Sequence, residues 1–363
     1  MLRRRSLRLE AVRVEWFETD CPQPSEAHRA AAEARQNVLT KPPGSLGVLE
    51  ALAIKLAALQ ATDRPRAARA PIVLFAGDHG VTAQGVSAYP ADVTVQMLHN
   101  FAAGGAAIAV LARELGVKLH VVDAGTLSEH DVPGVTTDKP RRGTRDFSHE
   151  AAMTTDELSF ALKAGRRAVE RARAGGADIV ILGEMGIGNT TSAAAIAASL
   201  LGVRAGDVVG AGTGLDAAGV NRKAEVIEAA LATHGLRAAD VPAAQVLKCV
   251  GGLEIAALAG AMIAAAQGRI PVLVDGFIVS VAALGAVRLN PSCAPWLIYS
   301  HRSLERGHRV VLDALAAEPL LDLKLRLGEG SGAAAALPLL RLACALHSEM
   351  ATFADAHISG PES

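Results

Sequence analysis

The stretch IVILGEMGIGNTT, residues 179–191, decides the fold class of this chain. Its first four residues are apolar and mostly β-branched, which is typical of a strand buried on both faces. Three glycines then occur within six positions, 183–188, and Asn189 and Thr190 open an alanine-rich segment of helical composition. A buried strand that leads through a glycine-rich turn into a helix is the unit from which α/β proteins are built.

The same unit recurs along the chain, and this recurrence predicts an α/β fold with a Rossmann-like parallel sheet flanked by helices. We expect strands at residues 72–76, 119–123, 179–182, 271–275 and 297–300. Helices are expected at residues 92–115, 154–174, 190–201, 253–266 and 276–288. Residues 63–70 and 131–146 have the composition of loops.

Two helical stretches, the first sixty residues and residues 332–356, lie outside these units. We therefore expect a smaller helical domain built from residues 21–65 and about 335–363. The large α/β domain, residues 66–334, would carry the active site. Residues 1–20, which include an arginine-rich run, are expected to form a poorly ordered tail.

Composition and charge exclude several classes of function. A formal net charge of −1 provides no general attraction for nucleic acid. The most apolar stretches, residues 193–203 and 255–266, are shorter than the roughly 20 residues that span a bilayer, so no membrane role is expected. We expect no secretory signal, and the four cysteines lack disulfide-motif or zinc spacing. These features predict a cytoplasmic protein with reduced thiols.

The glycine-rich turn predicts a phosphate site. Gly186 and Gly188 allow backbone N–H groups to face a ligand, and the start of the helix adds positive potential. Asn189 and Thr190 add side-chain donors. The alternative is a tight turn in which Asn189 or Thr190 caps the helix. The glycine order matches neither a Walker loop nor the dinucleotide fingerprint, and a second run, GAGTG at 210–214, is equally compatible with a flexible turn.

Two charged residues are candidates for chemistry. Glu329 lies between two glycines at the entrance of a helix, where a carboxylate can act as a general base. A favourable charge at the helix N-terminus explains the same residue equally well. Lys223, in LDAAGVNRK, is either a solvated helix lysine or a phosphate contact.

The histidines do not predict a metal site. Asp78-His79 follows an expected strand, and His301 and His308 lie in SHRSLERGH, yet none has the spacing of metal ligands. A structural or substrate-orienting role is the better interpretation. We expect neither a metal nor a cofactor.

Taken in order, several unusual strings resemble the nicotinate-nucleotide–dimethylbenzimidazole phosphoribosyltransferase family. The resemblance runs from about residue 20 to 355. The matching strings are KPPGSLGVLE (41–50), AGDHGV (76–81), GVSAYP (85–90), GEMGIGNTT (183–191), VGGLEIAALAGA (250–261), PVLVDGF (271–277), SHRSLERGH (300–308) and LGEGSGAAAALP (327–338).

The resemblance implies a homodimeric enzyme that acts on nicotinate mononucleotide and a benzimidazole base. It also implies roles for individual residues. Glu329 matches the glutamate that accepts a proton from the attacking base, and Glu184 matches a second active-site carboxylate. The phosphate-holding loop corresponds to Gly186, Gly188, Asn189 and Thr190, with Lys223 near the nucleotide. Positions around the incoming base correspond to Tyr89, Met97 and Met185.

Two other classes of function compete with this one. An NAD-dependent oxidoreductase is suggested by GAGTG, but the required glycine-rich helix entrance with a later acidic residue is missing. A catalytically idle nucleotide-binding protein would retain the phosphate loop and would have no need of Glu329. The presence of both features favours the enzyme.

Overall fold

The computed structural model describes residues 15–212, 214–238 and 240–359. In the described residues, six strands form one parallel sheet in the order β3-β2-β1-β4-β5-β6. The strands are β1 (Ile72–Gly77), β2 (Leu119–Gly125), β3 (Val135–Thr137), β4 (Val180–Met185), β5 (Val272–Val274) and β6 (Leu297–Tyr299). The predicted α/β class is confirmed.

Helices connect these strands, and further helices lie at one end of the molecule. The α-helices are α1 (Glu26–Val38), α2 (Val48–Gln60), α3 (Asp92–Ala103), α4 (Ala107–Leu115), α5 (Thr155–Ala174), α6 (Asn189–Leu201), α7 (Ala205–Val208), α8 (Ala217–Thr233), α9 (Ala243–Val250), α10 (Leu253–Gln267), α11 (Phe277–Leu289), α12 (Arg306–Ala314) and α13 (Ser331–Glu349). Within the described ranges, the short 3-10 helices are η1 (Trp16–Glu18), η2 (Gly80–Gln84) and η3 (Pro291–Trp296).

Each central strand is buried on both faces, as the apolar sequence of the strands predicts. Val73 and Phe75 of β1 belong to a core shared with α5, α6, α10 and α11. Ile72 and Leu74 of the same strand belong to a second core, shared with α2, α3, α4 and α13. Because successive side chains of a strand point to opposite faces, one apolar run supplies both layers.

Most predicted elements are present, with three kinds of difference. The helix expected at 92–115 is two helices, α3 and α4, because Gly104 ends α3 in the left-handed conformation at φ 80°. Within the segment 131–146, expected to be a loop, Val135–Thr137 forms the edge strand β3. Helices α7, α8, α9 and α12 are additional to the predicted set.

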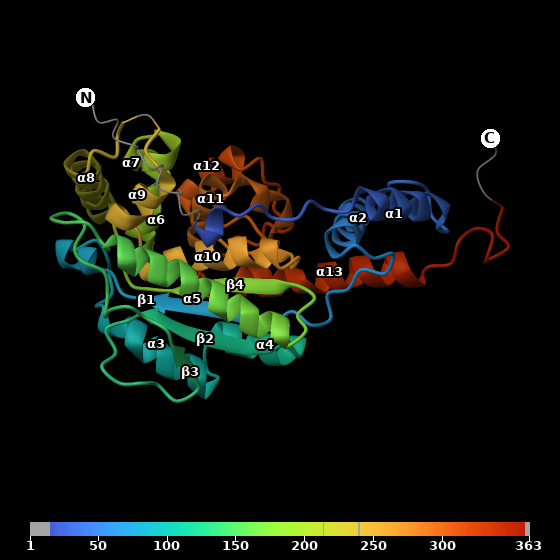
Figure 1. Cartoon of the computed structure of the whole chain (residues 1–363), viewed down its shortest axis with the longest axis horizontal. Helices are drawn as coiled ribbons and strands as arrows, with labels where there is room; N and C mark the ends of the chain where they lie inside the picture. Colours follow the sequence, from blue (N-terminus) through green and yellow to red (C-terminus); the bar gives the residue numbers. More distant parts are fainter. Residues whose placement is uncertain (1–14, 213, 239, 360–363) are drawn as a thin grey trace, which may run out of the picture.

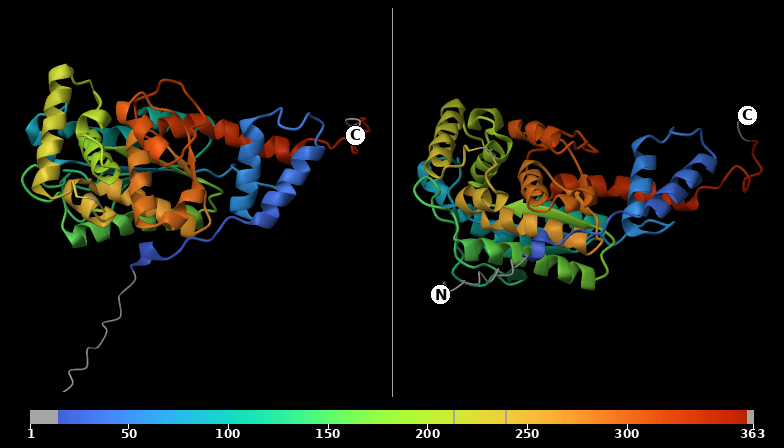
Figure 2. Two further views of the ribbon diagram at one scale, coloured as in Figure 1. Left: turned by 90° about the horizontal axis from the view of Figure 1, so that it is seen from above. Right: turned by 45° about the horizontal axis from the view of Figure 1, so that its top comes forward.

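The N-terminal region and the end of α13 lie together. Helix α2 contacts both α1 and α13, and these helices form one end of the molecule (Figure 1; Figure 2). Residues 1–14 of the predicted tail lie outside the described residues. Residues 15–20 are held in place, because Gln267 Nε2 donates hydrogen bonds to the carbonyls of Trp16 and Thr19, so this part is not a tail. The division into two domains stays a prediction.

One stretch of the described chain, Asp92–Leu115, is long and apolar enough to cross a membrane by length and composition alone. It is divided at Gly104, and both of its helices contact β2. Core helices pass the same test, so the feature is weak support for a membrane span.

Helices α5 and α10 cross at very short range, and this contact makes a stability prediction. A Cβ on Gly165 would lie 1.8 Å from the Ala257 carbonyl oxygen. We expect Gly165→Ala to lower the free energy of unfolding by about 2 kcal/mol or more, because overpacking outweighs the better helix propensity of alanine. Urea denaturation measures this difference. Gly206→Ala in α7 is the matched control, since nothing lies within 4 Å of its Cβ; equal midpoints for the two variants would contradict the prediction.

Candidate active site

The candidate site lies at the carboxyl ends of the central strands. The strand order reverses between β1 and β4, which is the point where open α/β sheets bind ligands. A cavity of about 670 Å³ opens there. Eight of the ten predicted site residues line it: Tyr89, Met97, Glu184, Met185, Gly186, Asn189, Thr190 and Glu329. Gly188 and Lys223 lie behind its wall.

Glu184 stands at the end of β4 and is only 5% exposed. Asn189, in the first turn of α6, donates a hydrogen bond to its carboxylate. Burial, together with the nearby charges of Asp275 and Glu254, raises the pKa of Glu184 to about 8. Near neutral pH this side chain is therefore largely protonated in the free protein.

Glu329 occupies a strained turn. Gly328, Glu329 and Gly330 all have positive φ, and the value for Glu329 is 62°. Gly183 of β4 lies so close that a Cβ there would be 2.4 Å from the Glu329 carbonyl oxygen. The carboxylate accepts a hydrogen bond of 3.2 Å from the backbone N–H of Ile108, in the first turn of α4. Such a conformation in a non-glycine residue is typical of a functional site.

Burial raises the pKa of Glu329, and the charge of Asp275 raises it further, whereas the hydrogen bond from Ile108 opposes the shift. A carboxylate with a raised pKa is a stronger base than one in water. The cavity thus contains two carboxyl groups, Glu184 and Glu329, and their surroundings disfavour the state in which both are ionised.

Asp275, at the end of β5, positions the Glu329 turn. Its carboxylate accepts hydrogen bonds from the backbone N–H groups of Gly330 and Ala333, at 3.1 Å and 2.9 Å. These N–H groups lie at the start of α13, where a helix leaves its donors without partners. Burial raises the pKa of Asp275.

The glycines of the predicted phosphate loop have packing roles. A Cβ on Gly186 would be 2.3 Å from the Gly77 carbonyl oxygen. A Cβ on Gly188 would be 2.6 Å from Thr82 Cγ2. The two glycines let the loop approach β1 and η2, and Gly188 does not line the cavity. At the start of α6, the backbone N–H groups of Asn189 and Thr191 already donate to the carbonyls of Gly186 and Gly188, at 3.1 Å and 2.9 Å.

Lys223 is paired with Thr190. It is 1% exposed, and its Nζ donates to Thr190 Oγ1 at 2.6 Å. Burial lowers the pKa of Lys223 to about 8, although the charge of Glu305 opposes this. Because the Thr190 hydroxyl accepts from the lysine, its own proton is free to point toward an anion in the cavity.

The histidines near this edge have structural partners. His79 contacts Ser192 Oγ through Nδ1 at 2.9 Å and Glu254 Oε1 through Nε2 at 2.7 Å. His308 Nδ1 accepts from the backbone N–H of Ser303. Among residues 15–212, 214–238 and 240–359, no group of three or more His, Cys, Asp or Glu side chains could hold a metal ion.

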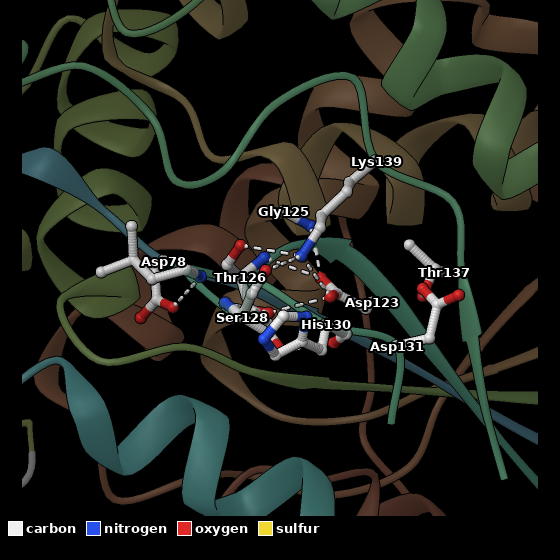
Figure 3. Close-up of polar contacts among 10 residues, drawn as sticks. Asp78, Asp123, Gly125, Thr126, Ser128, His130, Asp131, Thr137 and Lys139 are labelled. Atoms are coloured by element: carbon white, nitrogen blue, oxygen red, sulfur yellow. Dashed lines mark hydrogen bonds and ion pairs between the residues drawn. The ribbon is translucent and has the colours of Figure 1, made fainter. Parts of the chain in front are cut away.

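A second polar cluster lies at the end of β2, the strand next to β1 (Figure 3). Lys139 Nζ donates to Asp123 Oδ2 at 2.6 Å and to the carbonyl oxygens of Thr126 and Ser128. All three ammonium protons are used in this way. These bonds fasten the loop that follows β2.

Known proteins resemble the chain over almost its full length. A family model described as "Phosphoribosyltransferase" matches residues 21–358. The nicotinate-nucleotide–dimethylbenzimidazole phosphoribosyltransferase of Bradyrhizobium sp. (strain ORS 278) is 67% identical over 348 residues, which cover 96% of this chain and 99% of that protein. The chain belongs to this phosphoribosyltransferase family.

Other members of the family are similar to the chain over comparable lengths. A Pseudomonas putida (strain W619) protein of the same name is 59% identical over 345 residues, covering 95% of this chain and 98% of that protein. A crystal structure of the enzyme of this name from Thermus thermophilus has a TM-score of 0.87 and 43% identity, covering 93% of this chain and 100% of that one. The family resemblance expected from the sequence is confirmed.

In this phosphoribosyltransferase, the cavity also contains residues that the sequence did not predict for the site. Among them are Gly212, Gly276, His301, Ser303 and Glu305. Gly212 comes from the run GAGTG, and a Cβ there would lie 3.5 Å from Lys223 Nζ. Glycine enrichment alone was too weak a signal to select it. For His301, the sequence showed a histidine at the end of an expected strand, but it did not show which residue would contact the ring.

The pKa shifts predict how kcat/KM of this phosphoribosyltransferase depends on pH. If Glu329 is the general base, the acid limb is expected above the usual range of a glutamate, because burial raises the pKa of this carboxyl. The alkaline limb is expected near pH 8, because Lys223 is charged below its pKa of about 8 and neutral above it. Initial rates from about pH 5 to 10 measure both limbs. Lys223→Arg should move the alkaline limb upward; an unchanged limb would contradict the assignment.

Proposed function

We propose that the chain transfers the phosphoribosyl group of nicotinate mononucleotide to 5,6-dimethylbenzimidazole or a related base. The products would be nicotinate and α-ribazole 5′-phosphate, the precursor of the lower ligand of cobalamin. The observation that carries the proposal is one cavity with two buried carboxyl groups, Glu184 and Glu329, and a Lys223–Thr190 pair at a helix start. The names of the relatives support the same reaction.

The chemistry follows from the substrate. The nicotinate ring nitrogen is quaternary, so the C1′–N bond breaks with its electron pair leaving on a neutral pyridine. Positive charge develops at C1′ of the ribose, and a benzimidazole nitrogen attacks from the opposite face, which inverts the β-linkage to α. The second benzimidazole nitrogen then loses its proton. Holding base and sugar in line provides much of the acceleration.

Glu329 is the better candidate to accept that proton. Glu184 has a pKa of about 8 and is largely protonated near neutral pH in the free protein, so it is not available as a base there. Glu329 is kept in place by the Ile108 N–H and the Asp275-bound turn. The carboxyl of Glu184 is suited instead to a position close to the developing positive charge, where the cationic ring of the bound substrate favours its ionised form.

The direct test is to mix the protein with nicotinate mononucleotide and a panel of benzimidazoles and purines. Liquid chromatography with mass detection would follow nicotinate release and the new nucleoside phosphate. We expect base-dependent release of one nicotinate for each α-nucleotide formed. Binding of nicotinate mononucleotide without any release would overturn the proposal and favour an idle nucleotide-binding protein.

We expect Tyr89 and Met97 to influence the choice of base. Both line the cavity, and Tyr89 is 53% exposed at its edge. Replacing both with alanine should change the ratio of kcat/KM between dimethylbenzimidazole and a purine by about tenfold, because a lost apolar contact is worth about 1–3 kcal/mol. The KM for nicotinate mononucleotide should change much less. An unchanged base ratio in a competition assay would argue against this assignment.

Three further expectations from the sequence complete the proposal. The family resemblance implies a homodimer, which sedimentation analysis of the purified protein would test. A cytoplasmic location, and turnover without a metal or cofactor, likewise stay predictions. Activity that a chelator removes and a metal ion restores would contradict the last of these.

A further inference from the structure

An extended segment, residues 301–305, forms one wall of the cavity. His301, Ser303 and Glu305 line the cavity, whereas the two residues between them do not. This alternation is what an extended chain produces, since successive side chains point to opposite sides. The backbone N–H groups of Arg302 and Leu304 donate to the carbonyls of Leu321 and Leu325, which fixes the segment.

The two ends of this segment lie at different ends of the cavity. Glu305 is at the Lys223 end, because its charge acts on Lys223 and a Cβ on Gly210 would be 2.1 Å from its Oε2. His301 is at the Glu329 end. A Cβ on Gly332, just after the Glu329 turn, would be 2.0 Å from His301 Nδ1.

The imidazole of His301 has one edge held by protein and one edge left for a ligand. Its Nδ1 lies 3.1 Å from Ser300 Oγ and 3.6 Å from Asp275 Oδ1. Its Nε2 has no hydrogen-bond partner among the residues that the structure describes, and the ring packs beside Gly276 in the cavity wall. A carboxylate next to Nδ1 favours the tautomer with the proton on Nδ1. Nε2 is then an acceptor for a hydroxyl group.

We propose that His301 Nε2 accepts a hydrogen bond from a ribose hydroxyl of nicotinate mononucleotide, with Asp275 as the positioning residue for the ring. This inference rests on the proposed function. If the phosphate binds at the Thr190–Lys223 end and C1′ is close to Glu329, the ribose lies between them, along the segment that carries His301. The contact makes the enzyme selective for ribose over deoxyribose.

The test compares nicotinate mononucleotide with its 2′-deoxy and 3′-deoxy analogues. We expect the wild-type protein to reject the analogue that lacks the contacted hydroxyl by about 10- to 100-fold in kcat/KM, the loss expected when a buried partner is left unpaired. In His301→Ala this ratio should fall to within about threefold of one, because kcat/KM for the ribose substrate falls to the level of the analogue. His301→Gln retains an acceptor and should restore part of the discrimination, which a change in folding alone would not do.

His99→Ala is the matched control, since His99 is an exposed histidine of α3 that does not line the cavity; it should keep the wild-type ratio. The inference is overturned if His301→Ala keeps that ratio, if all substrates lose activity equally, or if the wild-type protein does not discriminate at all. A wild-type protein that releases no nicotinate from nicotinate mononucleotide would instead refute the proposed function. If His301→Ala unfolds below the assay temperature, the kcat/KM ratio of ribose to deoxyribose substrate is compared between His301→Gln and the wild-type protein instead.

Discussion

Replacing Glu329 with glutamine is expected to lower kcat by about 10²- to 10⁴-fold, the range of a positioned general base. The amide has almost the shape of the carboxylate and can still accept the hydrogen bond from Ile108. It cannot take the proton from the attacking benzimidazole. The binding of nicotinate mononucleotide should stay within about threefold of the wild-type value, because the proton transfer belongs to the transition state.

Rapid-quench measurement of nicotinate release separates these two effects. Calorimetric titration with nicotinate mononucleotide gives the dissociation constant directly. Glu318→Gln is the matched control, since Glu318 is exposed and does not line this cavity. Unchanged turnover in Glu329→Gln would exclude the residue as the base and would direct attention to Glu184.

Lys223→Met has the second largest expected effect, an increase of about 10- to 100-fold in the KM for nicotinate mononucleotide. Lys223 acts through Thr190, whose hydroxyl it orients and polarises. A hydrogen bond to a charged group is worth about 1.5–3 kcal/mol, which corresponds to this range. The value of kcat should change by less than about threefold, since the phosphate is bound equally in the ground and transition states.

The split between KM and kcat distinguishes this role from general damage to the fold. Lys163→Met, at an exposed position of α5, serves as the control and should behave as the wild-type protein. A fall in kcat at constant KM would contradict the assignment and would place Lys223 near the reacting atoms.

The sequence alone predicted the class of the fold and most of its elements. Runs such as IVIL at 179–182 are apolar at every position, and a strand covered on both faces buries all of them. The predicted boundaries of the helices were less accurate where a glycine ends a helix. The division of 92–115 depends on the left-handed backbone of Gly104, and an apolar pattern does not reveal it.

The candidate site was predicted in part. Glu184, Asn189, Thr190 and Glu329 follow strands or open helices, so their position at one edge of the sheet follows from topology. The packing role of Gly188 could not be predicted in this way. A glycine that makes room for Thr82 looks the same in the sequence as one that makes room for a phosphate. The roles of Asp275 and His301 depend on contacts across long sequence separations.

The glycine-rich strand-to-helix stretch at 179–191 was thus sufficient for the sheet and for a polar site at its edge. Local sequence determines which backbone conformations are available, and periodicity determines which faces are buried. Only the tertiary structure decided which charges meet in the cavity. Burial and the proximity of Asp275, Glu254 and Glu329 raise the pKa of Glu184 to about 8, and these groups are far apart in the chain. Electrostatic shifts depend on distance in space, and the fold sets that distance.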